Sequence, residues 1–106
     1  MRLFDAIFLA GQMPEGSVVC ARTPFLHGSD AIITQLTQTG GIPSDVKVEG
    51  FTYFVEANGI EELLQMISKK RASRERKAEF VCHYAEHDAY PVWFYDLTDL
   101  TAKSCL

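Results

Sequence analysis

The sequence predicts one soluble α+β domain: a mainly antiparallel sheet of four or five strands, with two or three helices packed on one face. Its apolar and charged fractions, 47% and 23%, are those of a folded globular protein. Segments rich in β-branched and aromatic residues are separated by turn signals and not by regular helical crossovers, which favours antiparallel pairing. Two segments repeat apolar residues at helical spacing. With 106 residues the chain has the size of one domain, which we assign to residues 1–106.

The N-terminal part predicts a helix followed by a strand. Residues 3–8 repeat apolar side chains on one helical face, and Gly11 stands where such a helix would end. Residues 12–16 contain a proline and a glycine and are expected to turn. Residues 17–22 include two adjacent valines, which favours a strand that stops before Pro24.

Residues 25–50 are the hardest to interpret. The run 31–36 fits either a buried strand or one turn of helix capped by Ser29 or Asp30, and we favour the strand. Residues 40–45 combine two glycines with a proline, so a surface loop is expected there.

A strand followed by a long helix is expected next. Residues 51–55 are aromatic and β-branched, which predicts the strand. The helix spans 58–72 and begins at Asn58, whose side chain can cap it while Glu61 reaches back. The basic residues 69–71 are expected in its last turn, where the helix dipole favours cations. Its apolar residues share one face: Ile60, Leu63, Leu64 and Ile67.

Two further strands, 77–84 and 92–97, are expected to form a hairpin because both are rich in aromatic and β-branched residues. Their connection, 86–91, is polar and contains a proline, which requires a loop. Residues 96–103 fit either a final helical turn capped by Thr98 or a frayed end.

The cysteine pattern indicates a reducing compartment. Three cysteines cannot all pair with one another, and none belongs to a C-x-x-C motif. Asp5 interrupts the apolar run at the N-terminus, so no secretory signal is predicted. No apolar stretch is long enough to span a bilayer. We therefore expect a cytoplasmic protein that does not enter membranes. The three cysteines are Cys20, Cys82 and Cys105.

Charge is divided along the chain. Six of the ten basic residues, and one of the fourteen acidic residues, fall between Lys69 and Lys77. This segment fits either a phosphate-binding patch or a solvated helix end. We favour the helix end, because nucleic-acid-binding proteins are usually basic and this chain has a net charge of −4.

Acidic and aromatic residues alternate near the C-terminus. Six of the twelve aromatic residues lie between residues 80 and 95. Carboxylates steer a basic partner, while tyrosine and tryptophan supply anchors in protein interfaces. The alternative is that the aromatics fill the core of the hairpin and the acids keep the surface soluble. The predicted partner-binding residues are Glu86, Asp88, Tyr90, Trp93, Asp96 and Asp99.

A thiol, two imidazoles and two carboxylates fall within residues 82–88. A metal site needs three or four of these groups to converge. On the predicted strand Cys82 and His83 point to opposite faces, which argues against joint ligation. A helix would align His83 with His87, but the aromatic flanks favour a strand. We predict no metal site.

Two catalytic arrangements are conceivable. The two histidines, with Lys77 or Arg76 on phosphate, are groups that a small metal-independent ribonuclease could use. A thiol of Cys20 or Cys82 could pair with His27, although Cys82 lies in an apolar run and is expected to be a buried hydrophobe. No phosphate loop, nucleophile elbow or dinucleotide motif occurs. We assign no catalytic residue and no cofactor.

The sequence therefore favours a small acidic protein-binding module over an enzyme. The most concrete case is a bacterial immunity protein or antitoxin that occludes the active cleft of a basic nuclease toxin. The alternative is a nucleic-acid-binding protein or ribonuclease that uses the basic segment 69–77 with His83 and His87. A subunit of a larger assembly is a third, weaker hypothesis.

Overall fold

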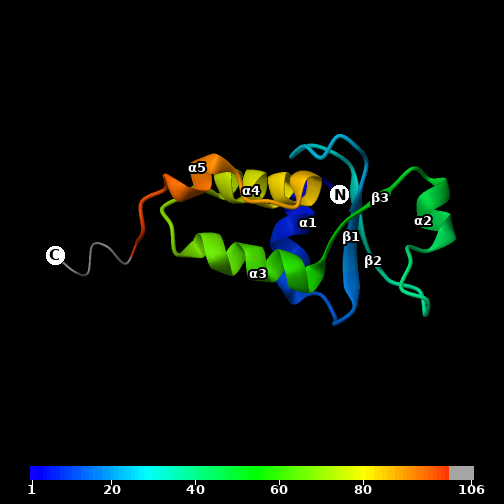
Figure 1. The fold of residues 1–106 in the computed structure, drawn as a ribbon. Coiled ribbons are helices and arrows are strands. Elements are labelled where there is room, and N and C mark those ends of the chain that lie inside the picture. The colour runs from blue at the N-terminus through cyan, green and yellow to red at the C-terminus, as the bar shows by residue number, and fades with distance from the viewer. Residues whose placement is uncertain (101–106) are drawn as a thin grey trace.

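A computed structural model describes residues 1–100 as a three-stranded sheet with five α-helices (Figure 1). The strands β1 (Ser17–Ala21), β2 (Ala31–Gln35) and β3 (Thr52–Glu56) are antiparallel in the order β2-β1-β3. The α+β class is confirmed, but the predicted numbers of four or five strands and two or three helices are wrong for the described residues. Within the described residues, no helix has the length and apolar character needed to cross a membrane. The helices are α1 (Leu3–Leu9), α2 (Ser44–Val48), α3 (Ala57–Ser68), α4 (Arg74–His87) and α5 (Val92–Tyr95).

The central strand β1 is buried along its whole length. Because side chains alternate along a strand, Val19 and Ala21 pack in the main core with α1, α3 and α4. Val18 and Cys20 face the other way and pack with Val46 of α2. Figure 1 shows α2 alone on that side of the sheet. The prediction that all helices lie on one face is therefore wrong, and residues 40–45 are a loop only up to the start of α2 at residue 44.

The predicted hairpin of residues 77–84 and 92–97 is wrong, because these residues belong to the helices α4 and α5. Aromatic and β-branched residues suggested strands, but residues 74–79 are mostly strong helix formers. The hydroxyl of Ser73 caps α4 by accepting a hydrogen bond from the Arg76 N–H at 3.1 Å. Asp88 ends α4 in the left-handed conformation, with φ of 52°.

The predicted apolar face of α3 is confirmed, but its predicted bounds are not. Ile60, Leu63 and Ile67 are buried, as expected. The helix begins one residue before Asn58, its N-cap is Glu56, and it has no side-chain cap. It ends at Ser68, so the basic residues 69–71 lie beyond its last turn and not within it.

The connection between α3 and α4 is paired with the residues that follow α5. The Arg71 N–H donates to the Thr98 carbonyl at 2.7 Å, and the Leu100 N–H donates to the Lys69 carbonyl at 2.9 Å. Residues 98–100 are therefore extended backbone and not the helical turn proposed for 96–103. Residues 101–103 of that prediction, and Cys105, lie outside the described residues.

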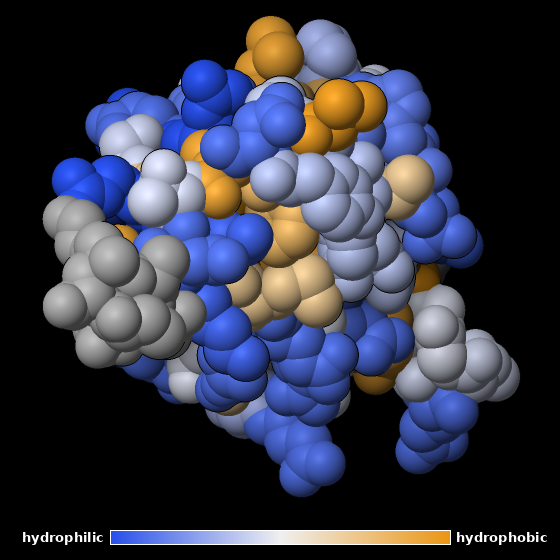
Figure 2. Space-filling model, turned by 60° about the vertical axis from the view of Figure 1, so that its left-hand side comes forward, coloured by the Kyte–Doolittle hydropathy of each residue, from blue (hydrophilic) through white to orange (hydrophobic). Residues whose placement is uncertain are grey.

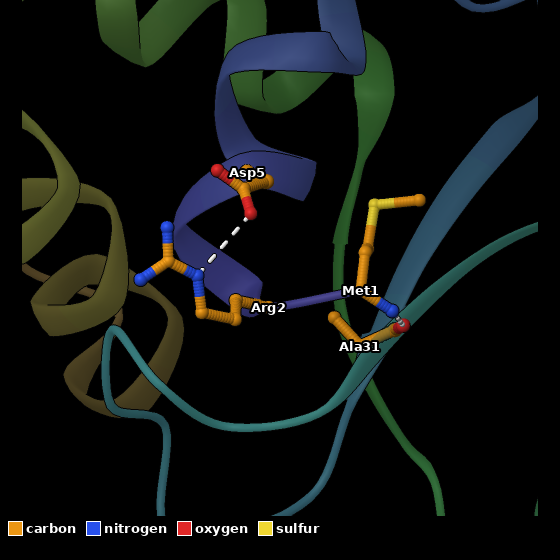
Figure 3. Close-up of polar contacts among 4 residues, drawn as sticks. All are labelled: Met1, Arg2, Asp5 and Ala31. Carbon is orange, nitrogen blue, oxygen red and sulfur yellow. Dashed lines mark hydrogen bonds and ion pairs between the residues drawn. The ribbon is translucent and has the colours of Figure 1, made fainter.

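The start of the chain is held against β2. The α-ammonium of Met1 donates to the Ala31 carbonyl at 3.2 Å, and the Ala31 N–H donates to the Met1 carbonyl at 2.7 Å (Figure 3). Arg2 and Asp5 form an ion pair of 3.3 Å on the outer side of α1 (Figure 3). The Leu3 N–H donates to the Ser29 carbonyl at 2.7 Å, so α1 also fixes the loop between β1 and β2.

Replacing Ser73 by alanine is expected to lower the free energy of unfolding by about 1 kcal/mol, because an N–H at the start of α4 loses its acceptor. Urea denaturation measures this change. The matched control is Ser68→Ala, an exposed serine whose hydroxyl donates to the Gln65 carbonyl at 2.6 Å and accepts no helix N–H. Its effect should stay within about 0.5 kcal/mol. Equal effects of the two variants contradict the assigned cap.

Candidate partner-binding surface

The structure separates the six predicted partner-binding residues into three groups. Asp88 and Tyr90 border hollows on the side of α4 that faces β3 and α3. Glu86 and Trp93 lie on the other side of α4, where Glu86 raises the pKa of Cys82 and Trp93 lines a pocket. The third group consists of Asp96 and Asp99, which follow α5.

Asp99 is distant from Asp88 and already has a partner. Its carboxylate contacts the Lys70 ammonium at 2.8 Å, beside the start of α4. Asp88 lies at the other end of this helix of 14 residues. At a rise of about 1.5 Å per residue, the helix separates the two acids by roughly 20 Å. The predicted set does not form one continuous surface.

A coherent surface instead surrounds two adjoining hollows. One, of about 340 Å³, lies between β3 and the C-terminal half of α4, and the other, of about 140 Å³, lies between α3 and α4. Tyr84 lines both hollows. No lysine or arginine among residues 1–100 lines either one. We call this the tyrosine surface and define it by Tyr53, Val55, Glu56, Glu62, Met66, Tyr84, Asp88 and Tyr90.

The electrostatics of the tyrosine surface are acidic. The carboxylate of Asp88 is the main cause of the raised pKa of Tyr84, and Glu62 adds to it. Desolvation raises the pKa of Tyr53, and the charge of Glu56 raises it further. Both phenols are therefore protonated at neutral pH and can donate hydrogen bonds. The surface offers tyrosine hydroxyls among carboxylates.

Sequence reasoning identified only Asp88 and Tyr90 of this surface. Glu62 and Met66 are four residues apart on α3, and Tyr84 and Asp88 are four residues apart on α4. Residues four apart are neighbours on a helix, with about 5 to 6 Å between their Cβ atoms, whereas on a strand they are separated by about 13 Å. The sequence did not reveal this surface because residues 77–84 were predicted to be a strand. In the structure residues 74–87 form the helix α4, which packs beside α3.

The aromatic residues near the C-terminus pack around one buried ring. Phe80 is fully buried, and its ring stacks on Tyr90 at 5.5 Å and on Phe94 at 4.8 Å between centroids. Trp93 meets the same ring edge-on at 6.4 Å. Tyr90 and Trp93 are therefore held in place by the core while part of each remains exposed. Such rigid aromatic groups lose little entropy when they bind a partner.

A second pocket lies on the other side of α4, where the loop between β1 and β2 approaches it. We call it the histidine pocket; its volume is about 450 Å³. Its apolar walls are Phe25, Leu26 and Trp93. Its polar lining is His27, Glu79, Cys82 and His83. His27 and Cys82, which the sequence suggested as a nucleophilic pair, thus border one cavity, as does one of the two candidate catalytic histidines.

His83 and His87 lie on one side of α4, with their ring centroids 4.5 Å apart. The sequence favoured a strand here over the helix that would align the two histidines, but the structure has the helix. Within residues 1–100, no three histidine, cysteine, aspartate or glutamate side chains come close enough together to hold a metal ion.

The basic segment 69–77 does not form a single patch. Lys70 is engaged by an aspartate, as described above. The Arg74 guanidinium lies over an aromatic ring of α1 at 4.4 Å. The Arg76 guanidinium covers Trp93 at 4.4 Å, on the side of α4 that holds the histidine pocket. These three side chains have different partners: Lys70 an aspartate, Arg74 a ring of α1 and Arg76 the ring of Trp93. This separation argues against a common phosphate-binding site.

The thiol of Cys82 is expected to be unreactive. Burial, with smaller effects of Glu86 and Glu79, raises its pKa to about 12, and burial also raises the pKa of Cys20. At pH 8 both thiols are protonated, whereas alkylation needs the thiolate. In a Cys105→Ser background, the folded protein should react with a thiol reagent only slowly and should take up two equivalents after denaturation. Fast labelling of the folded protein contradicts this assignment.

The surface shown in Figure 2 has a central apolar area bordered by hydrophilic residues. Isolated apolar groups of this kind are common on folded proteins and do not identify a function by themselves. Comparison with known protein families, with curated proteins and with solved structures finds no match.

Proposed function

We propose that this protein is a small acidic binding module that recognises a basic protein through the tyrosine surface. The most concrete case is a bacterial immunity protein or antitoxin that covers the active cleft of a basic nuclease toxin. One observation supports the proposal. Two tyrosines and two acids, Tyr84, Tyr90, Glu62 and Asp88, lie around two hollows that no lysine or arginine among residues 1–100 lines.

The charges of this surface suit a cationic cleft. The chain has a net charge of −4, and part of its positive charge is engaged elsewhere: Lys70 with Asp99, and Arg76 with Glu79. Carboxylates on the tyrosine surface attract a basic partner over several ångströms and speed its approach. They also disfavour acidic partners, which gives selectivity.

The tyrosines supply the contact area. Tyr53 is 43% exposed and Met66 is 38% exposed, so both are accessible to a partner. Tyr84 and Tyr90 are partly buried, with ring centroids 5.7 Å apart. Tyrosine is enriched among the residues that dominate binding energy, because it combines a large apolar ring with a hydroxyl.

The outer edge of β3 adjoins this surface. Among residues 1–100, β3 pairs only with β1, so its other edge has no strand partner. Such an edge can pair with an extended segment of a partner. The tyrosine surface and this edge together present side-chain anchors and backbone groups to the same partner.

The alternative, a nucleic-acid-binding protein or ribonuclease, receives less support. It requires the basic segment 69–77 to act with His83 and His87. Three of the basic side chains of that segment are engaged by rings or carboxylates, as described above. The tyrosine surface, by contrast, would repel phosphate.

The experiment that tests the proposal is co-expression. The chain is produced together with the product of each adjacent gene that encodes a basic protein, and growth and nuclease activity are measured. The proposal expects one of these proteins to be toxic alone and harmless with the chain, and the purified pair to form a complex. If no neighbouring product is neutralised or bound, the immunity function is rejected.

A further inference from the structure

The histidine pocket has the size and lining of a site for a small molecule. Its volume of about 450 Å³ falls within the usual range of ligand sites, about 300 to 1,000 Å³. Its walls combine the rings of Phe25 and Trp93 with a few polar groups. It lies on the side of α4 opposite to the tyrosine surface, so the two sites are separate.

One polar group of the pocket has a defined hydrogen-bonding role. Nδ1 of His83 lies 3.0 Å from the Ala89 carbonyl oxygen. A carbonyl only accepts hydrogen bonds, so the proton of the neutral ring is on Nδ1. Nε2 of His83 is then an acceptor, and no protein donor among residues 1–100 reaches it. A ligand with an N–H group meets this requirement.

The charges around the pocket cancel. The carboxylate of Glu79 contacts the Arg76 guanidinium at 3.3 Å, and that guanidinium lies over the ring of Trp93. The thiol of Cys82 is protonated, because burial raises its pKa to about 12. A ligand with a net charge would find no uncompensated opposite charge here. An uncharged ligand avoids the cost of desolvating an ion.

His27, another lining residue of the pocket, has an unsatisfied polar atom. Nε2 of His27 is buried and has no hydrogen-bond partner within the described residues. An unsatisfied buried polar group is rare in folded proteins. The loop that holds His27 also contributes Phe25 and Leu26 to the pocket, and Leu26 is 60% exposed at its rim.

We propose that the histidine pocket binds a small, uncharged, planar heteroaromatic molecule whose N–H group donates to Nε2 of His83. The ring of the ligand packs against Phe25 and Trp93. This site is independent of the proposed partner-binding function, and either one can fail without the other.

Indole and benzofuran test this inference, because they have the same shape and only indole has an N–H group. Trp93 is the chain's one tryptophan, so a ¹H–¹⁵N spectrum of the ¹⁵N-labelled protein contains a single tryptophan indole N–H signal. Indole should shift this signal saturably. Benzofuran should bind about threefold to tenfold more weakly, which corresponds to one neutral hydrogen bond.

The matched variants are His83→Ala and His87→Ala, which remove neighbouring imidazoles of the same helix. His83→Ala should weaken indole binding about threefold to tenfold and remove the preference over benzofuran, whereas His87→Ala should bind as the unaltered protein does. The comparison of the two ligands on the unaltered protein remains decisive if a variant fails to fold. The inference is overturned by the absence of a saturable shift, by equal binding of the two ligands, or by equal effects of the two variants.

Discussion

Replacing Phe80 by alanine is expected to lower the free energy of unfolding by about 3 to 5 kcal/mol, the cost typical of a deleted core phenylalanine. Its ring is fully buried and contacts Tyr90, Trp93 and Phe94. Its removal takes away the surface against which α5 packs. Natural domains of this size are stable by about 5 to 15 kcal/mol, so much of the total would be lost.

Urea denaturation followed by circular dichroism measures this loss, with Tyr95→Ala as the control. Tyr95 is an aromatic residue of the same region, but it is 66% exposed, and among the rings of residues 1–100 it meets that of Phe94 alone. Its replacement should cost less than about 1 kcal/mol. If the two variants lose the same stability, Phe80 is not the centre of this aromatic cluster.

The elements that the sequence predicted well are those in which local and tertiary preferences agree. Residues 17–21 include two adjacent valines, residues 52–56 are mostly β-branched or aromatic, and both segments are strands. Residues 3–9 repeat apolar groups at helical spacing and form a helix. The run 31–36 was ambiguous in isolation. Antiparallel pairing with β1 over residues 31–35 makes it a strand.

The main error arose where two local signals conflict. Residues 80–84 have the composition of a strand, whereas residues 74–79 favour a helix and follow the capping residue Ser73. Strand propensity reflects the packing of side chains on a sheet, so it is overridden when a helix buries the same groups. Here α4 buries Phe80 and Val81 against the main core. Residues 80–84 therefore continue the helix that begins after Ser73.

This error propagated to the candidate site. In a hairpin, Glu86, Asp88, Trp93 and Asp96 would have been close together. In the structure Glu86 and Asp88 lie on different sides of α4, Trp93 belongs to α5, and Asp96 follows α5. The acidic and aromatic character of the tyrosine surface could be predicted from composition. Its location could not, because it depends on the packing of α3 beside α4, which no local pattern specifies.

Charge reversal on the tyrosine surface is expected to weaken binding of a basic partner about tenfold to a hundredfold, mainly through a slower association rate. The variant is Glu62→Lys with Asp88→Asn. Asparagine keeps the left-handed backbone of residue 88, for which aspartate and asparagine are both suited. The change raises the net charge by three. The hollows would then present a cation to the partner's basic cleft.

The most direct measurement compares this variant with a control of equal net charge, Glu15→Lys with Glu49→Gln. Both control positions are exposed, one in the turn before β1 and one at the end of α2. Binding to the basic protein that the co-expression experiment identifies is measured at low and at physiological salt. The account predicts a large, salt-dependent loss of affinity for Glu62→Lys/Asp88→Asn and a small one for the control. Equal losses would show that only net charge matters, and would contradict a partner-binding site at the tyrosine surface.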